Sequence, residues 1–182
     1  MKKTFLTLAV ASIILTACNQ SDKKVETTNT TTEQAKTTKA IEVKSPIIAG
    51  YIAIGDALAK DDAKAAEEAA LVLADNINSF DENGLSAEQK VAFLNIKEDA
   101  LEHAEHIGSN GDNIDHQREH FKMLSENMYV MAKNVDPSQT FYKVTCPMYK
   151  EGSSWLSTTQ DVVNPYYGSS MLNCGSVEET IN

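Results

Sequence analysis

Between residues 45 and 84 the apolar side chains recur with the period of an α-helix in two successive segments. Ser45 followed by Pro46 is typical of a helix start, because a hydroxyl can cap the helix and proline suits its first turn. Asp61 or Asp62 can cap the second helix, which we expect to end near Gly84. The apolar faces comprise Ile47, Ile48, Tyr51, Ile54 and Leu58 in the first helix and Ala66, Ala69, Ala70, Leu73 and Ile77 in the second.

Two further helices are predicted up to about Val135. Ser86 and Gln89 form a capping-box pattern that opens the third helix, which should end at Gly108. A turn over residues 108–113 leads into the fourth. The apolar positions are Val91, Leu94, Ile96, Leu101 and Ala104 in the third helix and Ile114, Phe121, Leu124, Met128 and Met131 in the fourth. Four amphipathic helices with short connections predict a mostly α fold, an antiparallel four-helix bundle.

The pattern changes after Pro137. Residues 141–145 have strand character, and proline, glycine and serine punctuate the remainder. We therefore expect an irregular C-terminal segment, about 138–182, that contains a short β element. Trp155, Tyr166 and Tyr167 should pack this segment on the helices.

The start of the chain has the pattern of a lipoprotein signal. Two lysines precede an almost wholly apolar run over residues 5–15, which is too short for a bilayer span of roughly 20 residues. The run ends in Leu-Thr-Ala-Cys at residues 15–18, a lipobox. We expect a signal peptide over 1–17, lipidation of Cys18 and a membrane-anchored position in the cell envelope. The alternative is an ordinary signal peptide in which Cys18 is incidental.

Composition divides the rest of the chain into two parts. Residues 18–44 are rich in Thr, Lys, Gln and Glu and nearly lack large apolar side chains, which predicts a flexible tether after the lipidated cysteine. Residues 45–182 are enough for one domain with its own core. The 16 basic and 26 acidic side chains give a net charge of −10, which argues against nucleic acid as a partner and suits cations in a general way.

All four histidines of the chain lie on the third and fourth predicted helices, at positions 103, 106, 116 and 120. Spacings of three and four place each pair on one helix face, and the short turn near Gly111 makes the two helices antiparallel neighbours. His103, His106, His116 and His120 are therefore candidate ligands for copper, with zinc or another transition metal as alternatives. Acidic neighbours that could orient the rings are Glu102, Glu105, Asp115 and Glu119. The alternative is that the histidines are solvated surface residues.

Two cysteines remain after lipidation, and each has a methionine nearby. Cys146 with Met148, and Cys174 with Met171, form a second candidate metal set, because thiols and thioethers favour soft ions such as Cu(I). The alternative is a Cys146–Cys174 disulfide, which an exported compartment favours.

An enzyme is not predicted. Gln117 stands where a zinc protease motif would have its glutamate, and Ser153 and Ser154 belong to no nucleophile elbow.

Several motifs together resemble a known family. They are His103, His106 and Ile107; His116, His120 and Phe121 with Leu124 and Ser125; Cys146, Pro147 and Met148; Trp155, Leu156 and Ser157; Asn164, Pro165, Tyr166, Tyr167 and Gly168; and Met171, Cys174 and Gly175. They are similar to a bacterial lipoprotein domain of unknown function, also found appended to membrane-fusion adaptor subunits of heavy-metal (copper/silver) efflux systems. The resemblance implies copper at the histidine and Cys/Met positions and an efflux adaptor as a partner. The chain lacks the adaptor's own hairpin and barrel domains.

These patterns predict an envelope lipoprotein that binds copper as a buffer or as a donor to an efflux system or metalloprotein. The alternative is a non-catalytic protein-interaction module stapled by a Cys146–Cys174 disulfide.

Overall fold

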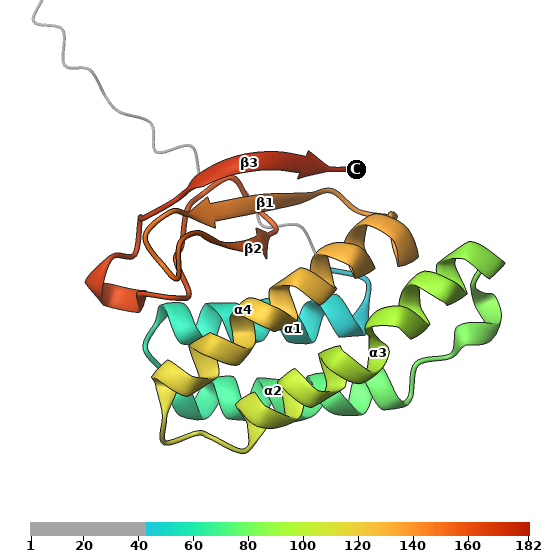
Figure 1. Ribbon diagram of the computed structural model, residues 1–182, viewed down its shortest axis with the longest axis horizontal. Coiled ribbons are helices and arrows are strands. Elements are labelled where there is room, and N and C mark those ends of the chain that lie inside the picture. Colours follow the sequence, from blue (N-terminus) through green and yellow to red (C-terminus); the bar gives the residue numbers. More distant parts are fainter. Residues whose placement is uncertain (1–42) are drawn as a thin grey trace, which may run out of the picture. The chain divides into compact units, whose positions relative to one another are not determined.

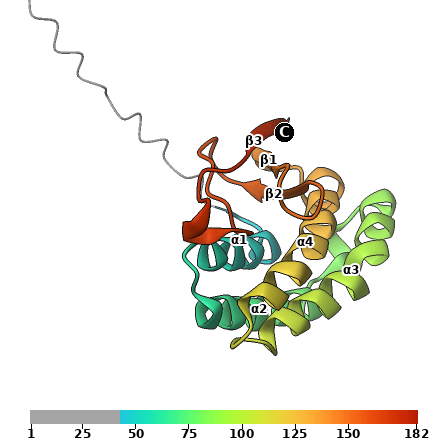
Figure 2. The same ribbon diagram turned by 60° about the vertical axis from the view of Figure 1, so that its left-hand side comes forward.

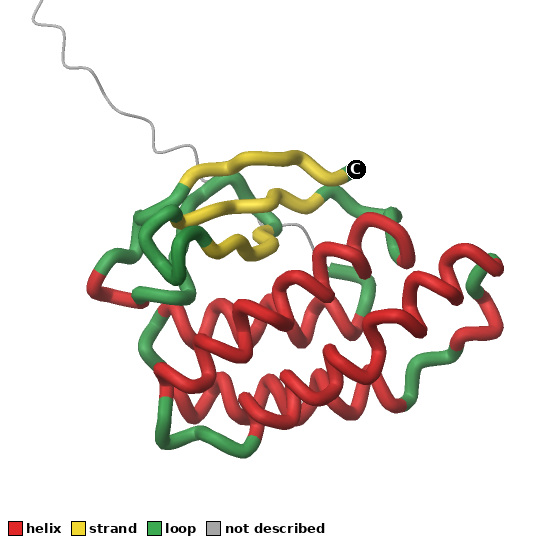
Figure 3. The backbone as a smooth tube through the Cα atoms, viewed as in Figure 1, coloured by secondary structure: helices red, strands yellow, loops and turns green. Residues whose placement is uncertain are grey.

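The computed structural model describes residues 43–182, which form a mostly helical structure with a small antiparallel sheet near the C-terminus (Figures 1 and 3). The helices are α1 (Pro46–Ala59), α2 (Ala63–Asn78), α3 (Ala87–Gly108) and α4 (Ile114–Val130). The strands are β1 (Phe141–Cys146), β2 (Ser153–Ser157) and β3 (Ser176–Ile181). Short 3-10 segments occur at Glu82–Gly84 and Gly168–Ser170, and a π-helical turn, Met131–Val135, extends α4. The prediction of a mostly α class is confirmed.

The helix starts follow the predicted caps. Ser86 and Gln89 make a complete capping box at α3. Of the two candidates for α2, Asp62 is the cap, since its carboxylate accepts the Ala65 N–H at 2.9 Å. The prediction that α2 ends near Gly84 was wrong. The helix ends at Asn78, and a separate 3-10 turn follows.

Consecutive helices pack on one another, and α1 also contacts α4. The apolar faces predicted for α1 and α4 are largely buried, with Ile47, Ile48, Tyr51, Ile54, Leu58, Phe121, Leu124, Met128 and Met131 in the core. The face of α3 was predicted correctly at Ile96 and Ala104, which are buried, but wrongly at Val91 and Leu94, which are exposed. Its buried positions are Phe93, Ile96, Ala100, His103, Ala104 and Ile107. The finer description of the four helices as an up-down bundle stays a prediction.

The C-terminal segment is more regular than predicted. Its three strands form one sheet in the order β2-β1-β3, with both neighbours antiparallel to β1. In both ribbon views the sheet lies over α1 and α4, while α2 and α3 lie farther from it (Figures 1 and 2). Trp155 and Tyr166 are buried against the helices as expected, whereas Tyr167 is only partly buried.

A buried polar network joins the sheet to the helices. The Tyr51 hydroxyl accepts the Leu156 N–H at 3.1 Å and lies 2.8 Å from the Ser125 hydroxyl. The Tyr166 hydroxyl donates to the Ser154 carbonyl at 2.6 Å. Because hydrogen bonds at a buried position are costly to leave unmade, this network fixes β2 against α1 and α4.

The predicted signal peptide, Cys18 and most of the tether lie outside the described residues. Within residues 43–182, no helix has the length and apolar character needed to cross a membrane.

Candidate metal centre

The hairpin between α3 and α4 sets the four histidines at one end of the two helices. Asn113 caps α4 by accepting the His116 N–H, and the Asn110 amide donates to the His106 carbonyl at the end of α3. Gln117 is fully buried, and its amide donates to the carbonyls of Ile107 and Ala63. The residue that replaces the glutamate of a protease motif therefore ties the start of α4 to α3 and α2.

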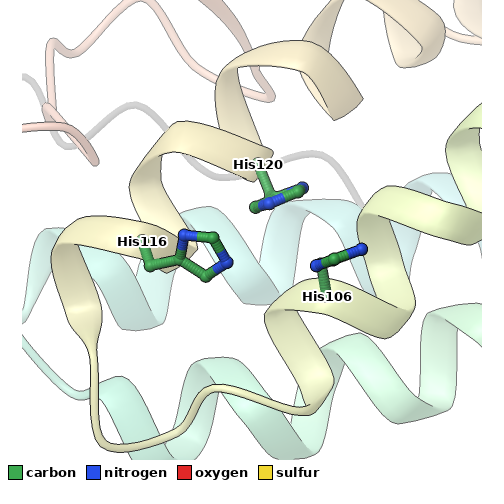
Figure 4. A group of neighbouring side chains, drawn as sticks. All are labelled: His106, His116 and His120. Carbon is green, nitrogen blue, oxygen red and sulfur yellow. The ribbon is translucent and has the colours of Figure 1, made fainter.

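Three histidines converge across this hairpin. One nitrogen atom each of His106, His116 and His120 lies within 4.8 Å of the other two (Figure 4). Among residues 43–182, this is the only group of three or more His, Cys, Asp or Glu side chains with ligand atoms so close together. The cysteines do not join it. Imidazole nitrogens bound to one tetrahedral ion sit roughly 3.4 Å apart, so the three nitrogens are close enough to share an ion once the side chains turn toward it.

The three rings lie in contact with one another. The His106 and His120 rings are stacked, with centroids 4.3 Å apart, and His116 meets His120 edge-on at 4.6 Å. His106 is exposed, and His116 and His120 are partly buried. An ion could therefore reach the group from solvent.

His103 stands outside the group of three but contacts it. Its Nδ1 lies 3.2 Å from Nδ1 of His120, so one of these atoms donates and the other accepts. Its Nε2 lies 3.6 Å from the Asp99 carboxylate, which in turn accepts the Asn127 amide at 2.9 Å. His103 is buried. This chain of contacts fixes the orientation of the His120 ring and leaves its Nε2 for a ligand.

The environment keeps His120 neutral. Burial, followed by the neighbouring rings of His106, His116 and His103, lowers the pKa of His120 from 6.5 to about 4. Only a neutral imidazole can coordinate a metal ion. His120 is thus ready to bind a metal ion at neutral pH.

This pKa predicts an acid-sensitive contribution to stability. A histidine whose pKa is lower in the folded than in the unfolded chain stabilises the fold above pH 6.5, and that stabilisation is lost as the pH falls toward about 4. We expect the free energy of unfolding of metal-free protein, measured in urea, to decline over this interval. His120→Gln should flatten the decline, and an unaltered slope in that variant would contradict the assignment.

Two of the four predicted acidic neighbours lie beside the rings. Glu102 lies 4.0 Å from Nε2 of His106, and Glu119 lies 3.9 Å from Nδ1 of His116. Glu119 also binds Lys150, whose ammonium lowers the pKa of the Glu119 carboxyl. Asp115 instead faces Arg118, at 3.7 Å.

The predicted sulfur set is only partly brought together. The sulfur atoms of Cys146 and Cys174 lie 2.6 Å apart, at the end of β1 and just before β3. Met148 is 62% exposed and lies on the surface. Met171 is partly exposed next to a 3-10 turn.

Sequence patterns did not reveal the role of Arg118. Its buried guanidinium donates to the carbonyls of Pro165 and Leu58 and to the Asp61 carboxylate at 2.6 Å. Asp61 has a positive φ of 59° and also accepts the Ser169 N–H. These contacts hold together the turn between α1 and α2, helix α4 and the loop after β2.

Comparison with known families gives a match over residues 47–140, which is about half of the chain and includes all four histidines. The matching family is described as "Protein of unknown function (DUF3347)". The chain belongs to this family. No curated protein and no solved structure matches it. The region that matches DUF3347 includes the helices and ends before β1. The sheet, with Cys146 in β1, therefore lies beyond the matched region.

Proposed function

We propose that the protein binds one transition-metal ion, copper in the first place, through His106, His116 and His120. The observation that carries this proposal is the convergence of three imidazole nitrogens within 4.8 Å across the hairpin of α3 and α4. Neutral imidazole is a ligand for Cu(II), Zn(II) and Ni(II), and among the divalent ions Cu(II) forms the tightest complexes with such ligands.

A site with three protein ligands leaves a coordination position open. Sites that hold an ion only for structure usually close the fourth position with a further side chain. Here His106 is exposed and the group faces solvent, so a ligand from another molecule could complete the coordination. This arrangement supports a buffer or a donor that passes the ion on, in preference to a structural ion locked in the fold.

The start of the chain favours the cell envelope as the place where the protein binds metal. The lipobox at residues 15–18 and the following polar stretch favour a lipoprotein tethered to a membrane of the cell envelope. The similarity of the motifs to a domain appended to heavy-metal efflux adaptors favours an exporter as the recipient.

Titration of the purified protein with Cu(II), and separately with Zn(II), in competition with a chelator tests the proposal. We expect one equivalent to bind, with Cu(II) tighter than Zn(II) and with electron paramagnetic resonance showing nitrogen coordination. Uptake without defined stoichiometry, or spectra without nitrogen ligands, would refute it.

A second candidate function rests on the contact between the sulfur atoms of Cys146 and Cys174. If a disulfide joins these residues, it links the end of β1 to the segment before β3. The domain can then act as a protein-interaction module without any metal. Binding of only loosely held metal ions would favour this alternative.

A further inference from the structure

The turn between β1 and β2 carries a lysine to the edge of the histidine group. The Nζ atom of Lys150 lies 2.6 Å from Oε1 of Glu119 on α4. The other oxygen atom of the same carboxylate, Oε2, lies 3.9 Å from Nδ1 of His116. Glu119 therefore stands between a candidate metal ligand and a cation that comes from the sheet.

The Glu119 carboxylate is near His116 but does not bind it. At 3.9 Å the oxygen atom is beyond hydrogen-bond distance of Nδ1. Figure 4 shows the other nitrogen atom of the His116 ring, Nε2, on the side that faces His106. With Nε2 directed at an ion, the Nδ1–H group is the one that a carboxylate would accept in order to orient the ring and raise its basicity. That contact is left unmade while Lys150 holds Glu119.

The backbone of the turn is strained at the residue that makes this ion pair. The φ angles of Lys150 and Glu151 are 46° and 63°, so two successive residues other than glycine lie in the left-handed region. Strain of this kind persists only where the surrounding structure imposes it, and it concentrates at functional sites. An exposed ion pair adds little to folding stability, so the pair of Lys150 and Glu119 does not explain the strain by stabilising the fold.

Packing beside Lys150 fixes the turn over α4. The Tyr149 ring stacks on the buried Tyr166 ring, with centroids 4.6 Å apart. The Tyr167 hydroxyl donates to the Met148 carbonyl at 2.9 Å. The turn therefore presents the lysine from a fixed position.

Given the proposed function of the histidine site, on which this role rests, we propose that Lys150 is a positioning residue that weakens metal binding. It does so by holding the Glu119 carboxylate away from Nδ1 of His116. A carboxylate that accepts a hydrogen bond from a ligating histidine strengthens metal binding by roughly 10- to 100-fold, and Lys150 withholds this gain. A protein that passes its ion on must release it, and a weaker site favours release.

The two members of the ion pair come from different parts of the chain. Glu119 lies within residues 47–140, which match the family, whereas Lys150 lies beyond them. The sheet region, which supplies none of the three converging histidines, thereby affects how tightly they hold an ion.

Competition titrations of the purified protein with Cu(II) test the role of Lys150. Lys150→Met keeps an unbranched side chain but removes the cation, so Glu119 can turn to His116 and the affinity should rise about tenfold. Lys150→Met/Glu119→Gln lacks the carboxylate, so its affinity should return to within about threefold of that of the unaltered protein. Lys150→Arg restores a cation at the same position and should leave the affinity within the same range.

Lys122→Met is the matched control for the loss of charge. Lys122 follows His120 closely on α4, and its ammonium pairs with Glu126 at 2.8 Å. The substitution removes the same charge near the site and should change the affinity by no more than about twofold. Equal gains in Lys122→Met and Lys150→Met, or a gain that survives Glu119→Gln, would overturn the proposal.

Nuclear magnetic resonance of the Zn(II)-loaded protein gives a readout that a general change of charge does not move. We expect the Nδ1–H proton of His116 to exchange rapidly with water in the unaltered protein. In Lys150→Met it should become protected from exchange, because Glu119 accepts it. A proton that exchanges equally fast in both proteins would contradict the assigned role.

Two outcomes separate this role of Lys150 from the proposed function itself. If the unaltered protein takes up no stoichiometric Cu(II), both are wrong. If it binds one equivalent but Lys150→Met binds no more tightly, the histidine site stands and only the role of Lys150 is refuted.

Discussion

Alanine in place of His106, His116 or His120 is expected to weaken Cu(II) binding by more than about a hundredfold in each case. Each substitution removes one of three converging nitrogen atoms. Loss of a ligand should cost more than loss of a residue that only orients a ligand, which typically lowers affinity by 10- to 100-fold. Competition titrations of the three single variants measure the effect, and circular dichroism shows whether the helices remain.

His103 is the internal comparison for this series. Its Nδ1 contacts His120 at 3.2 Å but His103 does not belong to the group of three. We expect His103→Ala to weaken binding by only about 10- to 100-fold, without changing the stoichiometry. Asp99→Asn should act through the same histidine, so its effect should vanish in a His103→Ala background.

Glu98→Gln is a control on α3, because Glu98 is exposed and remote in sequence from the three ligands. It should leave the affinity within about twofold, as for other screened surface charges. If the three ligand variants also bind Cu(II) as tightly as the unaltered protein, the histidines are not the site and the proposed function is wrong.

The convergence of the histidines was predictable from sequence because it depends on local rules. Helical spacing places His103 with His106 and His116 with His120, and a short turn makes the two helices antiparallel. Which three of the four histidines converge was not predictable. Which rings join the group depends on the rotation of α3 about its axis, and Val91 and Leu94 were wrongly predicted to be buried.

The sheet was harder to predict than the helices for a similar reason. Strands β2 and β3 are rich in serine and glutamate, which are uncommon in strands, and both lie at the edges of the sheet. Their regularity comes from pairing with β1, and for β3 that pairing spans the whole stretch from residue 147 to residue 175. The role of Arg118 also arises only when distant segments meet, since its hydrogen-bond partners lie 47 to 60 residues away.

Replacement of Arg118 by methionine is expected to cause the largest loss of stability among single substitutions outside the apolar core. Methionine is unbranched but shorter and donates no hydrogen bond, so the Pro165 carbonyl loses its donor while the Leu58 carbonyl keeps only the Asp61 N–H. A buried acceptor left unpaired costs about 1–3 kcal/mol, and Asp61 is too exposed to add much, so we expect a loss of about 2 kcal/mol. Urea denaturation followed by the fluorescence of Trp155, the single tryptophan, measures it.

Lys122→Met is the matched control on the same helix, because Lys122 forms an ion pair with the exposed Glu126. Loss of such a surface pair should cost no more than about 0.5 kcal/mol. Equal losses in the two variants would show that Arg118 contributes only surface charge.

The free energy of unfolding of Arg118→Met at low pH shows whether the loss of stability comes from the contacts of Arg118 or from a general loss of packing. Hydrogen bonds from Ser169, followed by that from Arg118, lower the pKa of Asp61 from 3.8 to about 2, so Asp61 stabilises the fold above pH 3.8 and this contribution is lost as the pH falls toward 2. Without Arg118 the pKa should rise and the acid-dependent loss should shrink. Because Arg118 faces the loop after β2 while His116 and His120 face α3, the folded variant should still bind metal. A variant that stays folded but loses Cu(II) binding would show that this buried arginine also sets the geometry of the histidines.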